Sequence, residues 1–134
     1  MSASITKNAV EKWHQMIENR DMSILSELLA DDVMFRSPVA FKPYEGKAVV
    51  FFILTNVIQV FENFTYHREF YTEDGLNVVL EFSAIVSEKQ LKGIDMIRFN
   101  AQGQIVDFEV MIRSKSGLEA LAVEMGQRIT QFKA

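Results

Sequence analysis

Asp95 is the residue best suited to acid–base chemistry. It stands in the apolar run 93–99, just ahead of a turn, and strand alternation puts it on the same side as Leu91 and Ile97. A carboxylate on such a face must be paired, protonated or hydrated, because an unpaired buried charge is too costly. We therefore predict a catalytic or ligand-binding acid with a raised pKa. The alternative is a structural acid bonded to Trp13, a backbone amide or water.

Three other kinds of polar side chain are candidates for a role in chemistry. The ring N–H of Trp13 is expected either to donate to a ligand or the acid, or to belong to a core ring on an amphipathic helix. Ser37 precedes a proline and is expected to bond nearby backbone or a ligand, but it has no neighbouring base to make it a nucleophile. His14 and His67 lack the spacing of metal ligands, so neither a metal nor a cofactor is predicted.

Composition narrows the classes of partner. The 134 residues carry a net charge of −4 without a cluster of Lys and Arg, which argues against nucleic acid. Cysteine is absent, which fits a reducing compartment. Residues 1–15 do not resemble a signal peptide, and the longest apolar run, 48–54, is far too short to span a membrane. We expect a cytoplasmic protein without a membrane partner, folded as one domain over 1–134.

The first half of the chain has the spacing of helices, interrupted by one strand. Thr6 and Asp21 are candidate N-caps of a first helix and of a second, short helix. The pair 31–32 breaks the pattern, and a short strand is expected over 33–37. After an irregular loop that contains both prolines, a longer helix is expected. Its inward residues are predicted to be Val50, Ile53, Leu54, Val57, Ile58 and Phe61.

The second half has the alternation of antiparallel strands. The expected strands cover 66–72, 76–86, 91–99 and 105–113, and a helix is expected over 117–128. This order predicts an α+β fold. Its cone-shaped, curved antiparallel sheet wraps around a long helix, with helices and a short strand at the N-terminus.

Turn lengths predict which side chains meet Asp95. A four-residue loop at 101–104 sets it opposite Val110, and a four-residue loop at 87–90 sets it opposite Phe82. The other expected pairs are Ile97 with Phe108, Phe99 with Val106, Arg98 with Asp107, Leu80 with Ile97, and Ala84 with Gly93. The last, small pair leaves space beside the acid, so we expect a hydrophobic pocket there. Its apolar walls are predicted to be Phe35, Phe82, Phe108 and Val110.

The first hairpin leaves two registers open. A tight turn at 74–75 directs His67 and Tyr71 to the Asp95 side of the sheet. A three-residue turn with a glycine bulge directs three other residues there: Tyr66, Arg68 and Phe70. A slip of one residue decides between them.

The opposite face of the expected sheet is also apolar. Its residues include Val79, Ile85, Ile94, Met96 and Met111. Such a face is typical of a covered surface, and we expect a homodimer formed through it.

The order of elements and several short segments resemble the nuclear transport factor 2-like superfamily, in its SnoaL-like and ketosteroid-isomerase-like branch. The segments are Asn19-Arg20-Asp21, Leu29-Ala30-Asp31-Asp32-Val33, Tyr44-Glu45-Gly46-Lys47, Gly93-Ile94-Asp95-Met96-Ile97-Arg98-Phe99 and Gly103-Gln104-Ile105-Val106. The resemblance covers nearly the whole chain. It implies a pocket for an apolar, cyclic molecule, with isomerase-like or cyclase-like chemistry.

The isomerases of that branch use an aspartate base before a proline, a tyrosine on the first helix and a protonated aspartate on a late strand. Ser37, Trp13 and Asp95 fall at those positions of this chain. A serine hydroxyl is a poor base, and an indole N–H does not exchange a proton at neutral pH, so the familiar steroid route is not expected. The expectation is a small-molecule pocket with one unusual acid; the alternative is a non-catalytic ligand-binding or dimeric assembly domain.

Overall fold

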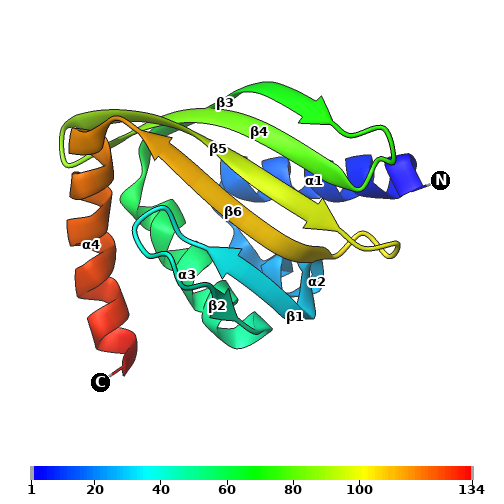
Figure 1. Ribbon diagram of the computed structural model, residues 1–134, viewed down its shortest axis with the longest axis horizontal. Helices are drawn as coiled ribbons and strands as arrows, with labels where there is room; N and C mark the ends of the chain where they lie inside the picture. Colours follow the sequence, from blue (N-terminus) through cyan, green and yellow to red (C-terminus); the bar gives the residue numbers. More distant parts are fainter. Residues whose placement is uncertain (1, 134) are drawn as a thin grey trace.

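The chain folds as a curved sheet packed against helices, which confirms the predicted α+β architecture (Figure 1). The computed structural model describes residues 2–133, with side chains from 4 to 128. Its elements are α1 (Ser2–Asn19), the 3-10 helix η1 (Met22–Ile24), α2 (Leu25–Leu28), β1 (Leu29–Arg36), β2 (Tyr44–Glu45), α3 (Lys47–Val60), β3 (Glu62–Tyr71), β4 (Asn77–Val86), β5 (Lys89–Phe99), β6 (Ile105–Arg113) and α4 (Lys115–Lys133).

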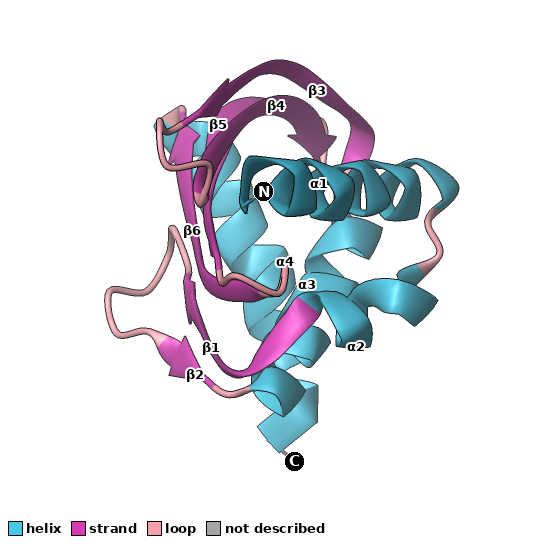
Figure 2. Cartoon of the chain, turned by 90° about the vertical axis from the view of Figure 1, so that its right-hand side faces the viewer, coloured by secondary structure: helices cyan, strands magenta, loops and turns pink. Residues whose placement is uncertain are grey.

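The strands form one sheet in the order β2-β1-β6-β5-β4-β3. Neighbouring strands are antiparallel except β1 and β6, which run parallel. The sheet curves around α1 and α3, and α4 stands across one end of it (Figure 2). The concave side of the sheet and the helices therefore enclose the core.

The N-terminal elements begin earlier than predicted. Thr6 is not an N-cap, because α1 already begins at Ser2 and the Thr6 side chain is buried within that helix. Asp21 does act as a cap, since its carboxylate accepts a hydrogen bond from the Ser23 amide at 3.1 Å. β1 begins at Leu29 and includes 31–32, because pairing with β6 extends the strand beyond the apolar run that indicated it.

Helix α3 fills the hollow of the sheet, as its apolar spacing predicted. Val50, Ile53, Leu54 and Ile58 are buried along it. Phe61 ends the helix and is also buried, while Val57 is partly exposed. This helix therefore presents an apolar wall to the sheet.

The β4–β5 hairpin is tighter than predicted. Ser87 and Glu88 both have positive φ angles, 47° and 70°, and form a two-residue turn of the kind that matches strand twist. Asp95 therefore lies opposite Leu80, and Phe82 lies opposite Gly93. The predicted Phe82–Asp95, Leu80–Ile97 and Ala84–Gly93 pairs are wrong by two residues. Because a shift of two keeps every side chain on its face, the inward set is unchanged.

The β5–β6 register agrees with the prediction along most of its length. Asp95 faces Val110, Ile97 faces Phe108, and Arg98 faces Asp107. Only the predicted Phe99–Val106 pair is wrong, since an irregularity at the turn pairs Phe99 with Ile105. The Asn100 side chain tightens this turn by accepting hydrogen bonds from the amides of residues 102 and 104.

Strand β3 follows neither predicted register throughout. Near the turn Tyr71 pairs with Val78 and faces inward, as the tight turn requires. A bulge between Tyr66 and Glu69 then turns Tyr66 inward in the place of His67. Both bulged residues point to the outer face, where His67 contacts Ser83 and Arg68 bonds Glu81. The inward position that the tight turn predicted for His67 is therefore wrong. The inward positions that the three-residue turn predicted for Arg68 and for the half-exposed Phe70 are wrong as well.

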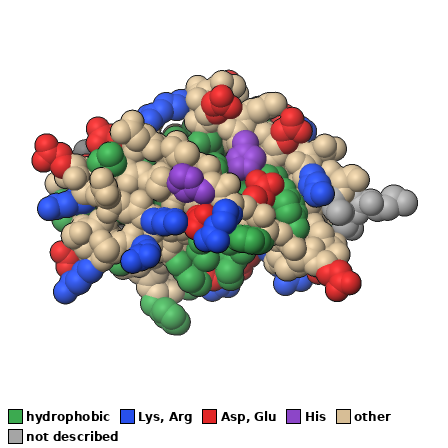
Figure 3. Space-filling view, turned by 90° about the horizontal axis from the view of Figure 1, so that it is seen from above, with side chains coloured by type: hydrophobic (Ala, Val, Ile, Leu, Met, Phe, Trp, Pro, Cys, Tyr) green, Lys and Arg blue, Asp and Glu red, His purple; other side chains and the backbone are tan. Residues whose placement is uncertain are grey.

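The outer face of the sheet mixes apolar and charged side chains. Met96 and Met111 are 39% and 46% exposed there. The Glu81 carboxylate is buried between Arg68, which binds it with two bonds of 2.7 Å, and Lys92 at 3.2 Å. Figure 3 shows hydrophobic side chains beside basic and acidic ones on the side seen from above. Within 2–133, no helix combines the length and the apolar character that crossing a membrane requires.

Candidate functional site

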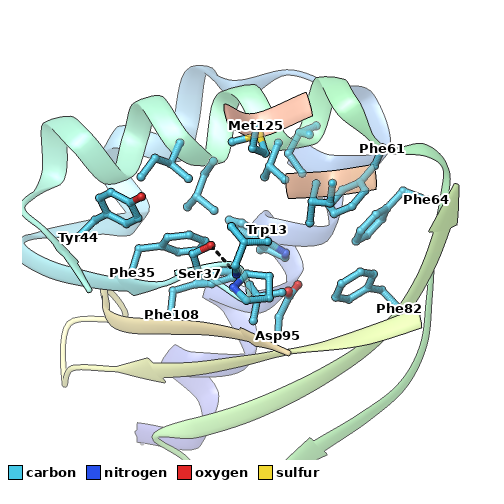
Figure 4. A pocket seen from close by; sticks show the side chains of 18 of the residues that line it. Trp13, Phe35, Ser37, Tyr44, Phe61, Phe64, Phe82, Asp95, Phe108 and Met125 are labelled. Atoms are coloured by element: carbon cyan, nitrogen blue, oxygen red, sulfur yellow. Dashed lines mark hydrogen bonds between the residues drawn. The ribbon is translucent and has the colours of Figure 1, made fainter. Parts of the chain in front are cut away.

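A cavity of about 50 Å³ lies between the concave side of the sheet, helices α3 and α4, and the loop after β1. All seven residues singled out in the sequence line it: Trp13, Phe35, Ser37, Phe82, Asp95, Phe108 and Val110. Figure 4 shows Asp95 at the centre beside Trp13. Phe61, Phe64 and Phe82 lie to one side of it, and Phe35, Tyr44 and Phe108 lie to the other. The acid therefore stands between two groups of aromatic rings.

The carboxyl group of Asp95 belongs to a row of three hydrogen-bonded side chains. Its Oδ2 accepts a hydrogen bond of 2.7 Å from the Tyr66 hydroxyl. That hydroxyl in turn accepts a bond of 2.7 Å from the Trp13 ring N–H. Asp95 is 5% exposed and Trp13 is 2% exposed, so both ends of the row are shielded from water, while Tyr66 between them is partly exposed. Three elements, α1, β3 and β5, meet at this point.

The surroundings of Asp95 favour its protonated form. Burial raises the pKa of the Asp95 carboxyl to about 7, against the lowering effect of the Tyr66 hydrogen bond. Burial also raises the pKa of the Tyr66 hydroxyl, and the neighbouring Asp95 raises it further, so the phenol keeps its proton. A carboxyl group that titrates near neutral pH can give and take a proton under ordinary conditions.

Ser37 lines the cavity directly after the end of β1. Its hydroxyl oxygen accepts a hydrogen bond from the Val39 amide at 3.1 Å, which fixes the start of the loop. The hydroxyl proton is left to donate to another group. The structure therefore shows Ser37 fixing the start of the loop, and no carboxylate or imidazole among the described residues that line the cavity lies within a hydrogen bond of its hydroxyl.

Tyr66 is the residue that the sequence analysis did not assign. The open register of the first hairpin left its side undecided, and the bulge in β3 is what brings it to Asp95. The pairing of Trp13 with Tyr66, instead of directly with Asp95, has the same origin. Helix α4 also contributes to the lining, through Leu121 and Met125.

The histidines lie outside the cavity. His14 bonds Glu69 at 2.8 Å on the far side of Tyr66, and His67 contacts Ser83 on the outer face. Across the described residues, no group of three or more His, Cys, Asp or Glu side chains is arranged to hold a metal ion.

Comparison with known proteins shows which family the chain belongs to. The family model described as a SnoaL-like domain matches residues 10–108. The sequence is 54% identical to that of a steroid delta-isomerase from Pseudomonas aeruginosa whose crystal structure is known. The two structures superpose with a TM-score of 0.92, and the match covers 96% of this chain and 93% of that one. The sequence is 34% identical to that of an uncharacterised bacterial protein with a cystatin-like fold from Silicibacter pomeroyi. The TM-score is 0.85, and the match covers 91% of this chain and 85% of that one.

A more distant structure shares the fold alone. It is an NTF2-like protein of unknown function from Mesorhizobium loti, 13% identical, with a TM-score of 0.75 over 85% of this chain and 95% of that one. No curated protein matches the chain. The match of the family model and the close similarity to the first two structures agree with the cone-shaped fold and the predicted resemblance. The chain therefore belongs to the SnoaL-like domain family of the nuclear transport factor 2-like superfamily.

Proposed function

We propose that this protein binds an apolar, cyclic molecule that carries an oxygen, and catalyses an isomerase-like proton transfer through Asp95. The observation that carries the proposal is the position of that acid. Among the described residues that line the cavity, Asp95 supplies the one carboxyl group, and the remainder of the lining is mostly apolar and aromatic. A ligand oxygen that gains charge in the reaction would be stabilised by a proton or hydrogen bond from this group.

The aromatic lining favours a ring compound over a flexible chain. Phe61, Phe64 and Phe82 contact one another with ring centroids 5.0 to 5.7 Å apart. Phe35 and Phe108 form a second contact at 5.8 Å. Flat apolar walls on both sides of one acid fit a flat apolar ligand with its oxygen at the centre.

The similarity to a steroid delta-isomerase supports isomerase chemistry without naming this chain's substrate. Ser37 supplies no carboxylate, so water would carry the proton between the two carbons while the protonated Asp95 donates a hydrogen bond to the ligand oxygen. In an isomerisation of that kind, the water would take a proton from the carbon beside a carbonyl, the electron pair of the C–H bond would move into the enolate, and Asp95 would stabilise the charge on the enolate oxygen. Return of the proton to a different carbon would complete the shift with no net oxidation.

The cavity must open to admit such a ligand. Its volume of about 50 Å³ is far below the ~300 Å³ at the lower end of ligand pockets. Met125, on α4, lines it and has an unbranched side chain that adapts readily to a new shape. Ligand binding is therefore expected to displace lining side chains.

The test compares Asp95→Asn with the control Asp107→Asn in a screen of cyclic ketones that includes a 3-oxo-Δ5-steroid. Asp107 lies on the same sheet but bonds Arg36 away from the cavity. We expect turnover to fall about 10²-fold to 10⁴-fold in Asp95→Asn and to stay near the parent value in the control. Unchanged turnover in Asp95→Asn would remove the acid from the chemistry. Tight binding, followed by Trp13 fluorescence, with no turnover by the parent protein would indicate a non-catalytic carrier.

A further inference from the structure

Tyr66 stands in the wall between two hollows of the molecule. Its hydroxyl lies in the cavity with Asp95, while its ring also borders an open groove of about 500 Å³ beside α1. Ile58 and Phe64 line both hollows with it. On the groove side, the His14 ring meets the Tyr66 ring edge to face, with centroids 4.9 Å apart.

Aromatic contacts hold the Tyr66 ring in one orientation. Phe64 meets it at 4.8 Å and Phe82 at 6.4 Å, both nearly perpendicular. His14 is a third edge-to-face neighbour of the ring. The hydroxyl is therefore presented at a fixed place in the cavity.

The indole sets the direction of the hydrogen-bonded row. An indole N–H can only donate, so Trp13 must give its proton to the Tyr66 oxygen. The Tyr66 proton is then left to point at its other partner, Oδ2 of Asp95, 2.7 Å away. Because Oδ2 already accepts the Tyr66 proton in a hydrogen bond, it is disfavoured as the oxygen that carries the acid's own proton. Any proton carried by Asp95 must therefore reside on Oδ1.

We propose that Tyr66 is a positioning residue that distinguishes the two oxygens of Asp95, holding Oδ2 so that Oδ1 alone carries the exchangeable proton and meets the ligand oxygen. The inference rests on the proposed function of Asp95 and extends it to a residue on another strand. The ligand would then meet a single oxygen of the acid, in one orientation. Trp13 contributes by polarising Tyr66, which makes the phenol a stronger donor.

Few titratable groups face this row. Of the residues that line the cavity, those that titrate are Asp95, Tyr66 and Tyr44. Behind Tyr66, on the groove side, lie His14 and the Glu69 carboxylate to which it is bonded. Among the described residues that line the cavity, those from α3, α4, β1 and β6 are uncharged. Loss of the Tyr66 hydroxyl should thus act on Asp95 directly, by removing the bond that stabilises its ionised form.

The test is Tyr66→Phe, with Tyr71→Phe as the matched control. Tyr71 lies on the same strand, and its hydroxyl donates to Glu69 at 2.9 Å, outside the cavity. Carbon-13 NMR of the labelled Asp95 carboxyl gives its titration midpoint in each folded protein, whether or not a substrate is known. We expect Tyr66→Phe to raise the midpoint by about one pH unit and Tyr71→Phe to leave it in place. An unchanged or lowered midpoint in Tyr66→Phe, or an equal rise in both variants, would overturn the inference.

A second variant covers the case in which Tyr66→Phe does not fold. Trp13→Phe keeps the phenol but removes the group that polarises it, so the Asp95 midpoint should rise by a smaller amount than one unit; no rise would contradict the row. With a turnover substrate, Tyr66→Phe should lower kcat about tenfold or more, leave KM nearly unchanged and move the pH profile upward. Because the NMR midpoint needs no turnover, a failure of the proposed function and a failure of this inference give different results.

Discussion

The Asp95 carboxyl should make the protein less stable as the pH rises from 5 to 8. In the unfolded chain this carboxyl has the ordinary pKa of 3.8, whereas burial raises its pKa in the folded protein to about 7. Between these values the folded state binds a proton that the unfolded state has released. Stability linked to this group is therefore fully present below pH 4, falls through that range and levels off above pH 7.

The size of the effect follows from the two pKa values. A rise of about three units in pKa corresponds to ~4 kcal/mol above pH 7, and about 3 kcal/mol of that loss falls between pH 5 and pH 8. Asp95 is 5% exposed, so screening by solvent takes little from this figure. Asp95→Asn has no charge to bury and should lose none of it. The variant should therefore gain about 3 kcal/mol on the parent protein over that interval.

Urea unfolding followed by the fluorescence of the buried Trp13 measures this difference at pH 5 and pH 8. Glu81→Gln is the matched control. Arg68 holds the pKa of the Glu81 carboxyl down to about 2, so this group is ionised in the folded state and mostly ionised in the unfolded state throughout the interval. Its replacement should change stability equally at the two pH values. If Asp95→Asn also differs from the parent equally at both, the raised pKa of the acid is wrong.

Three further predictions concern the shape of the molecule and its surfaces. Gly93→Ala should destabilise the protein by about 1–3 kcal/mol in urea unfolding, since the new methyl would lie 2.5 Å from the Met111 carbonyl oxygen and 2.8 Å from the Phe82 ring. The control Gly126→Ala should not destabilise the protein, because its methyl would meet nothing within 4 Å. The homodimer through the outer face stays a prediction. Met96→Glu should shift the sedimentation of the protein toward the monomer, while the control Val123→Glu on α4 should not. A parent protein that sediments as a monomer would contradict the predicted dimer. Ser37→Asp should give isomerisation of a 3-oxo-Δ5-steroid by adding a base to the cavity lining. An inactive but folded variant would show that a base at position 37 does not reach the ligand.

The sequence predicted the inward faces of the strands better than their pairing. Alternation alone put Asp95 and Phe82 on one side, and the structure keeps them there although the β4–β5 pairing differs by two residues. Burial selects a face, and a shift of two residues leaves that face unchanged. The pairing itself depends on the turn, where Ser87 and Glu88 take positive φ angles that their residue types did not indicate.

The alternation of residues along β3 could not predict that Tyr66 is the hydrogen-bond partner of Asp95. A bulge in β3 between Tyr66 and Glu69 exchanges the inward residue, and no glycine or proline within that strand marks its position. The exchange is explained by what the bulged residues bond: Arg68 reaches the buried carboxylate of Glu81 on the outer face. Because that contact joins two strands, the sequence pattern within one strand does not predict it. The same is true of the step from Trp13 to Tyr66, which joins α1 to β3.

The most direct test of the central claim is the protonation state of Asp95 in the folded protein. Difference infrared spectra between pH 5 and pH 9, with Asp95→Asn as the reference, isolate the C=O stretch of this one protonated carboxyl. We predict a band that is present at pH 5 and disappears with a midpoint of about 7. A midpoint near 4 would contradict it, because the acid would then be hydrated or paired instead of enclosed by the aromatic walls of the cavity.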